Sequence, residues 1–254
     1  MATETLTISV RVYSGSEWKT MSSSSAGYAA FGKLSTGAYR GIEISFKTTK
    51  TTTSEFDFRI PQCISAPSGS PATAGNYTWY YCLSTTKVSG APNTATGNVV
   101  SWTSQTVYGN KGTYANAQLK FSASGIKTGT TYYFYVYSTG PESGKSGDGY
   151  INYPTAYNYY KEYSLTKPSS CSFNGTKGFY SGGDYCTMQV STDSSYPYIY
   201  ASNSSSGNFS YVGQATSGTA TIKISSSTSS DNSIAKYFVA CDTQLDQLTG
   251  ITTS

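Results

Sequence analysis

The sequence predicts an all-β protein built from two β-sandwich domains and an N-terminal β-strand arm. Three observations support this fold class. Strong helix formers rarely stand together, whereas β-branched and aromatic residues are frequent, with 25 tyrosines among 254 residues. Apolar and polar residues alternate in many short segments, which Gly, Pro, Ser and Asn separate. Finally, an aromatic content of 15% is unlike that of disordered chains.

The first strand, residues 5–13, alternates strictly and is followed by a Gly turn and a run of four serines, residues 22–25. A serine run is typical of a linker. The sequence therefore predicts residues 1–25 as a tethered arm, which pairs with the sheet of a neighbouring subunit because a lone strand is not stable. The expected assembly residues are its apolar side chains, Leu6, Ile8, Val10, Val12 and Trp18.

The first sandwich is expected over residues 26–167. Alternation over residues 42–47 and 55–60 predicts a hairpin, with Ile42, Ile44 and Phe46 on one face of its first strand. On the second strand the corresponding apolar face carries Phe56, Phe58 and Ile60. The other expected strands are 77–83, 99–107, 117–122 and 157–166, with a long loop over 138–156.

A crossing between two sheets is predicted at residues 126–137. Ile126 is followed by a turn at Gly129, and Tyr132 then opens a strand rich in aromatic residues. This pattern resembles the tyrosine corner of immunoglobulin-like and fibronectin type III domains, in which a tyrosine hydroxyl bonds to the backbone just upstream. The resemblance implies an immunoglobulin-like or jelly-roll-like sandwich and says nothing of function.

The second, smaller immunoglobulin-like sandwich is expected over residues 168–242, after a linker at Lys167 and Pro168. Short strands at regular intervals predict it. They are residues 185–190, 198–202, 209–214, 219–224 and 235–241. Residues 243–254 are expected to form a loose tail.

Several classes of function are disfavoured by composition. The chain has no histidine, which excludes Ser-His-Asp and Cys-His catalysis and imidazole metal sites. Glu43, Glu55 and Asp57 are interpreted as cross-strand partners of Lys47 and Arg59 rather than as a glycosidase pair. We therefore expect a non-enzymatic protein without metal or cofactor.

Charge and cysteine usage point the same way. The net charge is +4 without a basic cluster, so no nucleic-acid partner is expected, and no segment is apolar enough for membrane insertion. The five cysteines are interpreted as small buried hydrophobic residues. A disulfide between Cys186 and Cys241 is the alternative.

Aromatic side chains are the candidate ligand-binding residues. The tyrosines outnumber what one core can absorb, so some are expected on the surface, where flat rings stack on sugar C–H groups. Residues near 79–81 and 150–160 concentrate them. The candidates are Trp79, Tyr81, Tyr150, Tyr153, Tyr157 and Tyr159.

The arm carries a family resemblance. Residues 8–19, Ile-Ser-Val-Arg-Val-Tyr-Ser-Gly-Ser-Glu-Trp-Lys, resemble a short β-hairpin motif of bacteriophage tail proteins. The resemblance implies a virion structural protein, tail-associated or surface-decorating, whose partners are other virion proteins and copies of itself. With the aromatic residues, it implies attachment to a host-surface polysaccharide.

The N-terminus shows no signal-peptide pattern, which agrees with a virion protein made in the host cytoplasm. The alternative is a secreted or cell-surface bacterial adhesin, or a carbohydrate-binding module, whose signal peptide has been removed.

Overall fold

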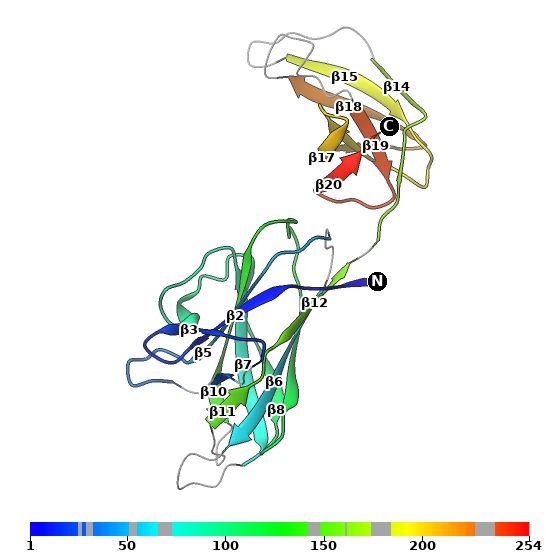
Figure 1. The fold of residues 1–254 in the computed structure, drawn as a ribbon. Coiled ribbons are helices and arrows are strands. Elements are labelled where there is room, and N and C mark those ends of the chain that lie inside the picture. The colour runs from blue at the N-terminus through cyan, green and yellow to red at the C-terminus, as the bar shows by residue number, and fades with distance from the viewer. Residues whose placement is uncertain are drawn as a thin grey trace. The chain divides into compact units, whose positions relative to one another are not determined.

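In the computed structural model the chain forms two compact units, residues 1–161 and 162–254. The residues that the structure describes are 1–24, 27–28, 33–50, 55–65, 73–141, 148–160, 162–173, 184–226 and 237–253. Among these residues β-strands make up nearly all of the regular secondary structure, and the one helical element is a single 3-10 turn, η1 (Pro92–Thr94) (Figure 1). The predicted all-β fold class is confirmed.

The N-terminal unit is a sandwich of two antiparallel sheets. In order, sheet 1 contains β1 (Ala2–Thr5), β12 (Thr155–Tyr160), β6 (Glu55–Ser65), β11 (Asp148–Ile151) and β4 (Gly27–Tyr28), and β9 (Ala115–Ser122) also pairs with β6. Sheet 2 contains β3 (Trp18–Met21), β2 (Ile8–Tyr13), β5 (Gly41–Phe46), β10 (Tyr132–Pro141), β7 (Gly75–Ser84) and β8 (Val100–Gly109). The segment that the sequence predicted as a long loop, residues 138–156, contains β11 and overlaps the end of β10 and the start of β12.

The inner faces of the two sheets enclose one hydrophobic core. Phe58 of sheet 1 stacks on Phe134 of sheet 2, with ring centroids 4.0 Å apart. The ring centroid of Phe46 lies 5.5 Å from those of both Phe56 and Phe58. Alternation along each strand sends every second side chain into this core, so the residues between them face outward.

The predicted arm is wrong, because residues 1–21 belong to this sandwich. Strand β2 pairs with β5 along its whole length, and β1 pairs with β12. Leu6, Val10 and Val12 are buried in the core, and Ile8 packs against it. The apolar face was predicted correctly, but its partner is a strand of the same chain whose paired residues lie 28 (Tyr13 with Gly41) to 38 (Ile8 with Phe46) positions further along.

The predicted hairpin of residues 42–47 and 55–60 is also wrong. Strand β5 lies in sheet 2 and β6 in sheet 1, so the two strands face each other across the core. Their apolar faces are as predicted, since Ile42, Ile44 and Phe46 meet Phe56, Phe58 and Ile60 there. Alternation specifies which face is buried, but not which strand lies alongside.

The hydrogen bond predicted at the sheet crossing is present. The chain passes from β9 in sheet 1 to β10 in sheet 2, and Gly129 adopts φ +75° in the turn. The hydroxyl of buried Tyr132 accepts a 2.8 Å hydrogen bond from the backbone N–H of Lys127.

The C-terminal unit also contains two antiparallel sheets. In order, the larger contains β13 (Leu165–Thr166), β19 (Tyr237–Cys241), β16 (Tyr198–Ser202), β17 (Ser206–Gln214) and β20 (Gln247–Thr252). The smaller contains β14 (Ser170–Phe173), β15 (Asp184–Ser191) and β18 (Thr219–Ser226). The strand predictions for this unit agree with the structure to within a few residues at each end.

Both predicted boundaries of the C-terminal unit need correction. The unit begins at residue 162, because β13 pairs with β19 just before the predicted linker. The predicted tail contains β20, whose Leu248 is fully buried against β17. Tyr200 secures this end of the chain, since its hydroxyl donates a 2.9 Å hydrogen bond to Leu245 O.

Candidate functional site

Two of the predicted ligand-binding residues, Trp79 and Tyr81, lie in the core of the N-terminal unit. Their prediction as ligand-binding residues is therefore wrong. Their side chains are only 2% and 3% exposed. Both faces of β7 carry aromatic residues, so the alternation by itself could not tell which face is outside. The outward residues are Tyr80, which is half-buried, and Cys82, which a loop buries.

Tyr153 has a structural role. Its ring packs against the edge of the core, and its hydroxyl donates a 2.9 Å hydrogen bond to Ile8 O. This bond joins the segment between β11 and β12 to β2 of the other sheet. Tyr153 therefore closes one side of the sandwich.

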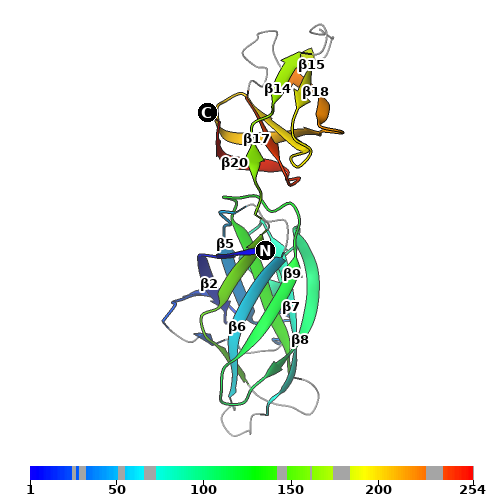
Figure 2. The ribbon, with the colours of Figure 1, turned by 90° about the vertical axis from the view of Figure 1, so that its right-hand side faces the viewer.

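Tyr157 and Tyr159 lie side by side on the outside of sheet 1. We call the outward side chains of β1, β12, β6 and β9 the open face. Because Phe56 and Phe58 point into the core, their neighbours on β6 point outward, and cross-strand pairing sets them beside the two tyrosines and β9. Figure 2 shows β6 and β9 running side by side along the unit. The outward residues of β6, β9 and β12 include Glu55, Asp57, Arg59, Gln118, Lys120, Thr155, Tyr157 and Tyr159.

Asp57 is the polar centre of the open face. Its side chain is fully buried beneath its neighbours, and Oδ2 accepts hydrogen bonds from Arg59 Nη2 at 3.0 Å and Gln118 Nε2 at 2.9 Å. The Tyr159 hydroxyl donates to the same oxygen at 3.3 Å. Oδ1 has no partner among the residues described. The carboxylate therefore fixes the orientation of three side chains on the face.

Two cationic side chains, Arg59 and Lys120, complete the open face. The guanidinium of Arg59 lies 5.0 Å from the ring centroid of Tyr157, and Lys120 Nζ lies 5.9 Å from that of Tyr159. Lys120 also pairs with Glu55 at 3.6 Å. The hydrogen bond to Asp57 and its negative charge raise the pKa of Arg59 above its ordinary value. Each of these cations thus has a carboxylate partner within the face.

Tyr150 lies at the far end of the same side of sheet 1. It pairs with Cys63 across β11 and β6, and 36% of its side chain is exposed. Of the six predicted ligand-binding residues, Tyr150, Tyr157 and Tyr159 therefore share one surface.

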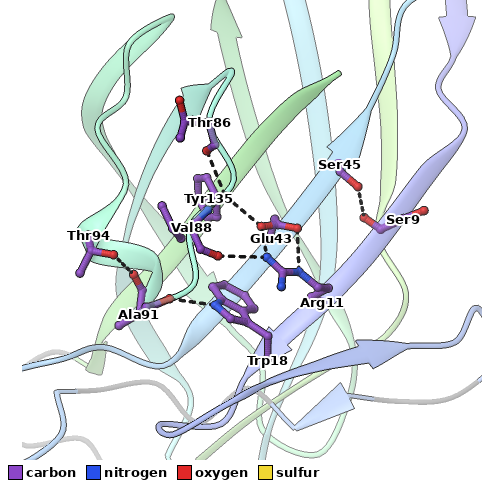
Figure 3. A network of polar contacts seen from close by, with 11 residues as sticks. Ser9, Arg11, Trp18, Glu43, Ser45, Thr86, Val88, Ala91, Thr94 and Tyr135 are labelled. Atoms are coloured by element: carbon purple, nitrogen blue, oxygen red, sulfur yellow. Dashed lines mark hydrogen bonds and ion pairs between the residues drawn. The ribbon is translucent and has the colours of Figure 1, made fainter. Parts of the chain in front are cut away.

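The outside of sheet 2 is different, because residues 85–99, which we call the cover loop, lie over it. Beneath this loop Glu43 forms a bidentate pair with Arg11 and accepts a 2.9 Å hydrogen bond from the Tyr135 hydroxyl (Figure 3). Arg11 also donates to Val88 O, and Val88 N donates to Tyr135. Burial raises the pKa of Tyr135, so the phenol stays protonated and donates to Glu43.

Trp18 belongs to this covered face and was predicted to be an assembly residue. The guanidinium of Arg11 lies 4.6 Å from the centroid of its ring, and its indole N–H donates a 2.8 Å bond to Gly90 O. Trp18 therefore secures the cover loop. Glu43 lies on this sheet, whereas Glu55 and Asp57 lie on the other one, so the three carboxylates do not form one site.

Sequence reasoning missed an aromatic cluster beside the cover loop. Tyr137 stacks between Tyr39 and Tyr80, at centroid distances of 4.5 and 5.2 Å, and Trp102 meets its edge at 5.2 Å. All four side chains are half-buried. The alternation of β7 and β10 was the available signal, since it sets Tyr80 and Tyr137 on the face opposite Trp79.

The C-terminal unit holds a pocket of about 620 Å³ between the β13–β14 segment and strands β19 and β20. Its lining includes exposed Cys171 and Tyr237. Cys63, Cys82, Cys171 and Cys241 carry free thiols, so the alternative disulfide of Cys241 is not present. Cys82 and Cys241 are buried as predicted, whereas Cys63 is half-buried.

Among the described residues no group of three or more Asp, Glu or Cys side chains is arranged to hold a metal ion. No helix in that part of the chain has the length and hydropathy needed to cross a membrane. No protein-family model matches the sequence, and no curated protein is similar to it.

Proposed function

We propose that this protein is a non-enzymatic attachment protein whose open face binds a host-surface glycan. The observation that carries the proposal is the pair Tyr157 and Tyr159, half-exposed and flanked by Arg59, Gln118 and Lys120. Aromatic rings stack on the C–H surfaces of sugars, and fixed donors and acceptors bind their hydroxyl groups.

The face is also ordered before any ligand arrives. Asp57 holds the Arg59 guanidinium, the Gln118 amide and the Tyr159 hydroxyl through one oxygen. Side chains that are already fixed lose less conformational entropy on binding. A pre-organised polar surface with two aromatic rings therefore suits a ligand that offers many weak contacts.

A glycan microarray tests the proposal. The wild-type protein is expected to bind a subset of the glycans, and the double variant Tyr157→Ala/Tyr159→Ala is expected to lose this binding. Tyr108→Ala is the matched control, because Tyr108 is 55% exposed on β8, outside the open face. Circular dichroism checks that both variants fold. If the wild type binds no glycan, or the double variant binds as well as the wild type, the proposal is wrong.

We place this attachment protein on a bacteriophage virion, as the motif at residues 8–19 suggests. In the fold that motif forms β2 and β3, which lie inside the sandwich. Mass spectrometry of purified particles is expected to find the protein in a fixed ratio to the other virion proteins. Its recovery only from the culture medium or the bacterial surface would favour a secreted adhesin with the same glycan-binding face.

A further inference from the structure

The open face extends along nearly the whole outer side of β6. Five outward residues of this strand follow one another at every second position, namely Glu55, Asp57, Arg59, Pro61 and Cys63. Glu55 and Cys63 are eight residues apart, which corresponds to about 27 Å of strand. Strand β9 accompanies β6 from Glu55 to Gln62, and β12 and then β11 flank its other side.

A second tyrosine pair stands at the far end of this strip. Tyr150 lies opposite Cys63, and the segment that carries Tyr114 is held against β6 by hydrogen bonds from Ile64 N to Asn110 O and from Gly112 N to Ile64 O. Tyr114 and Tyr150 are 43% and 36% exposed. Partial burial raises the pKa of Tyr114, and the charges of Cys63 and Tyr150 act in the same direction.

Apart from Pro61, the residues between the two tyrosine pairs are polar and present hydrogen-bonding groups. Exposed Gln118 and Asn116 lie on β9, and exposed Thr155 lies on β12. The charges of the strip compensate each other, since Arg59 pairs with Asp57 and Lys120 with Glu55. A surface with balanced charges offers no net attraction to a polyanion, whereas its amides and hydroxyls suit an uncharged ligand.

We propose that the strip along β6 is an extended binding track for a linear, uncharged polysaccharide, with one tyrosine pair at each end. The near pair is Tyr157 and Tyr159, and the far pair is Tyr114 and Tyr150. This inference rests on the proposed glycan-binding function and specifies its ligand as an internal stretch of a chain rather than a single terminal sugar. Two aromatic subsites that bind the same polysaccharide chain act together, so the affinity of the protein for a ligand rises once the ligand reaches both.

Titration with oligosaccharides of increasing length tests the track. The probes are linear neutral oligosaccharides of glucose, galactose, mannose and N-acetylglucosamine, from disaccharide to octasaccharide, with a heparin octasaccharide as the charged counterpart. Affinity for the neutral series that binds is expected to rise with length until the ligand reaches both pairs. Equal affinity for short and long members, or tighter binding of heparin, overturns the track.

Variants separate the two proposals. Tyr114→Ala/Tyr150→Ala is expected to weaken octasaccharide binding about tenfold and to leave disaccharide binding unchanged. Tyr157→Ala/Tyr159→Ala is expected to weaken both, and Tyr108→Ala neither. If the far-pair variant binds the octasaccharide like the wild type while the near-pair variant does not, the track is wrong and the glycan site stands. If neither pair matters, both proposals fail.

A second copy of the chain is the other occupant that the strip could take. Analytical ultracentrifugation of the wild type and the far-pair variant distinguishes it. The track predicts the same oligomeric state for both proteins. A wild-type oligomer that dissociates in the far-pair variant makes the strip an interface between copies and overturns the track.

Discussion

The two outer faces of the N-terminal sandwich have similar residue types and opposite arrangements. Each carries tyrosines, an arginine and a carboxylate. On sheet 2 the cover loop encloses them, and Glu43 and Tyr135 are almost completely buried. On sheet 1 Asp57 is buried as well, but the groups around it lie nearer the surface, and the Arg59 side chain is 38% exposed. The covered face stabilises the fold, and the open face remains accessible to a ligand.

The difference lies in what the ion pairs contribute. A buried carboxylate that loses its partners is strongly destabilising, whereas exposed pairs contribute little because water screens them. Glu43, paired with Arg11, is such a buried carboxylate, whereas Glu55 and Lys120 form an exposed pair. The comparison thus predicts a large stability effect for Glu43 on sheet 2 and a small one for the exposed Glu55 on sheet 1.

The largest effect is expected for Glu43→Ala. This change leaves Arg11 without its carboxylate and the buried Tyr135 hydroxyl with only the Thr86 carbonyl oxygen, at 3.3 Å, as acceptor. We expect the free energy of unfolding to fall by about 3 to 5 kcal/mol. Urea denaturation, followed by the tryptophan fluorescence of the N-terminal unit, measures this change. A loss below about 1 kcal/mol would show that the covered face does not depend on this pair.

Gly41→Ala is expected to have the next largest effect. A Cβ at this position would lie 2.2 Å from Val136 O and 2.9 Å from Cγ of Pro92 in the cover loop. The backbone oxygen cannot move away cheaply, so we expect a loss of about 1 to 3 kcal/mol and displacement of the loop. Hydrogen exchange of residues 85–99 measures the displacement. Unchanged exchange together with unchanged stability would contradict the close packing of Pro92 on β5.

Glu4, on strand β1 of sheet 1, is expected to have a smaller, pH-dependent effect on stability. Partial burial raises the pKa of Glu4, but hydrogen bonds from Thr49, Asn158 and Lys50 outweigh it, and the pKa lies below its ordinary value of 4.5. Since the folded-state pKa is the lower one, Glu4 stabilises the fold above pH 4.5 and loses this effect as the pH falls through the folded-state pKa.

The variant Glu4→Gln isolates this contribution. The stability difference between wild type and variant is expected to be about 1 kcal/mol at neutral pH and to shrink below the ordinary pKa of glutamate. Thermal denaturation across this pH range measures it. A difference that stays constant with pH would mean that the charge of Glu4 does not hold β1.

The smallest effect is expected for Glu55→Ala on the open face. Its pair with Lys120 is exposed, with 35% and 49% of the two side chains accessible. We expect a change within about 0.5 kcal/mol in the same urea assay. A loss as large as that of Glu43→Ala would abolish the distinction between the two faces.

Much of this arrangement follows from alternation in the sequence. Alternation correctly identified the inward residues of β2, β5 and β6 and set Tyr157 and Tyr159 on one side of a strand. It could not assign strand partners, which is why β5 and β6 were predicted as a hairpin and residues 1–25 as an arm. Long-range pairing, such as that of β2 with β5, depends on tertiary contacts that no local window contains.

The candidate site was predictable in part for the same reason. Tyr150, Tyr157 and Tyr159 face outward, whereas Trp79 and Tyr81 face inward, and β7 has aromatic residues on both sides. Which side is buried depends on tertiary packing, here of Tyr81 against Phe121 of the opposite sheet and Phe134 of the neighbouring strand β10. The contribution of Arg59, Gln118 and Lys120 required the register of β6 with β9.

Hydroxyl-radical footprinting tests the central claim most directly, because it compares the two faces in one experiment. The protein is labelled with and without the neutral oligosaccharide that it binds most tightly. Bound ligand is expected to protect Tyr157 and Tyr159, and Tyr114 and Tyr150 with a long oligosaccharide, while labelling of Tyr80 and Trp102 stays unchanged. Protection of Tyr80 and Trp102 with unchanged labelling of Tyr157 and Tyr159 would contradict the assignment of the binding surface to sheet 1.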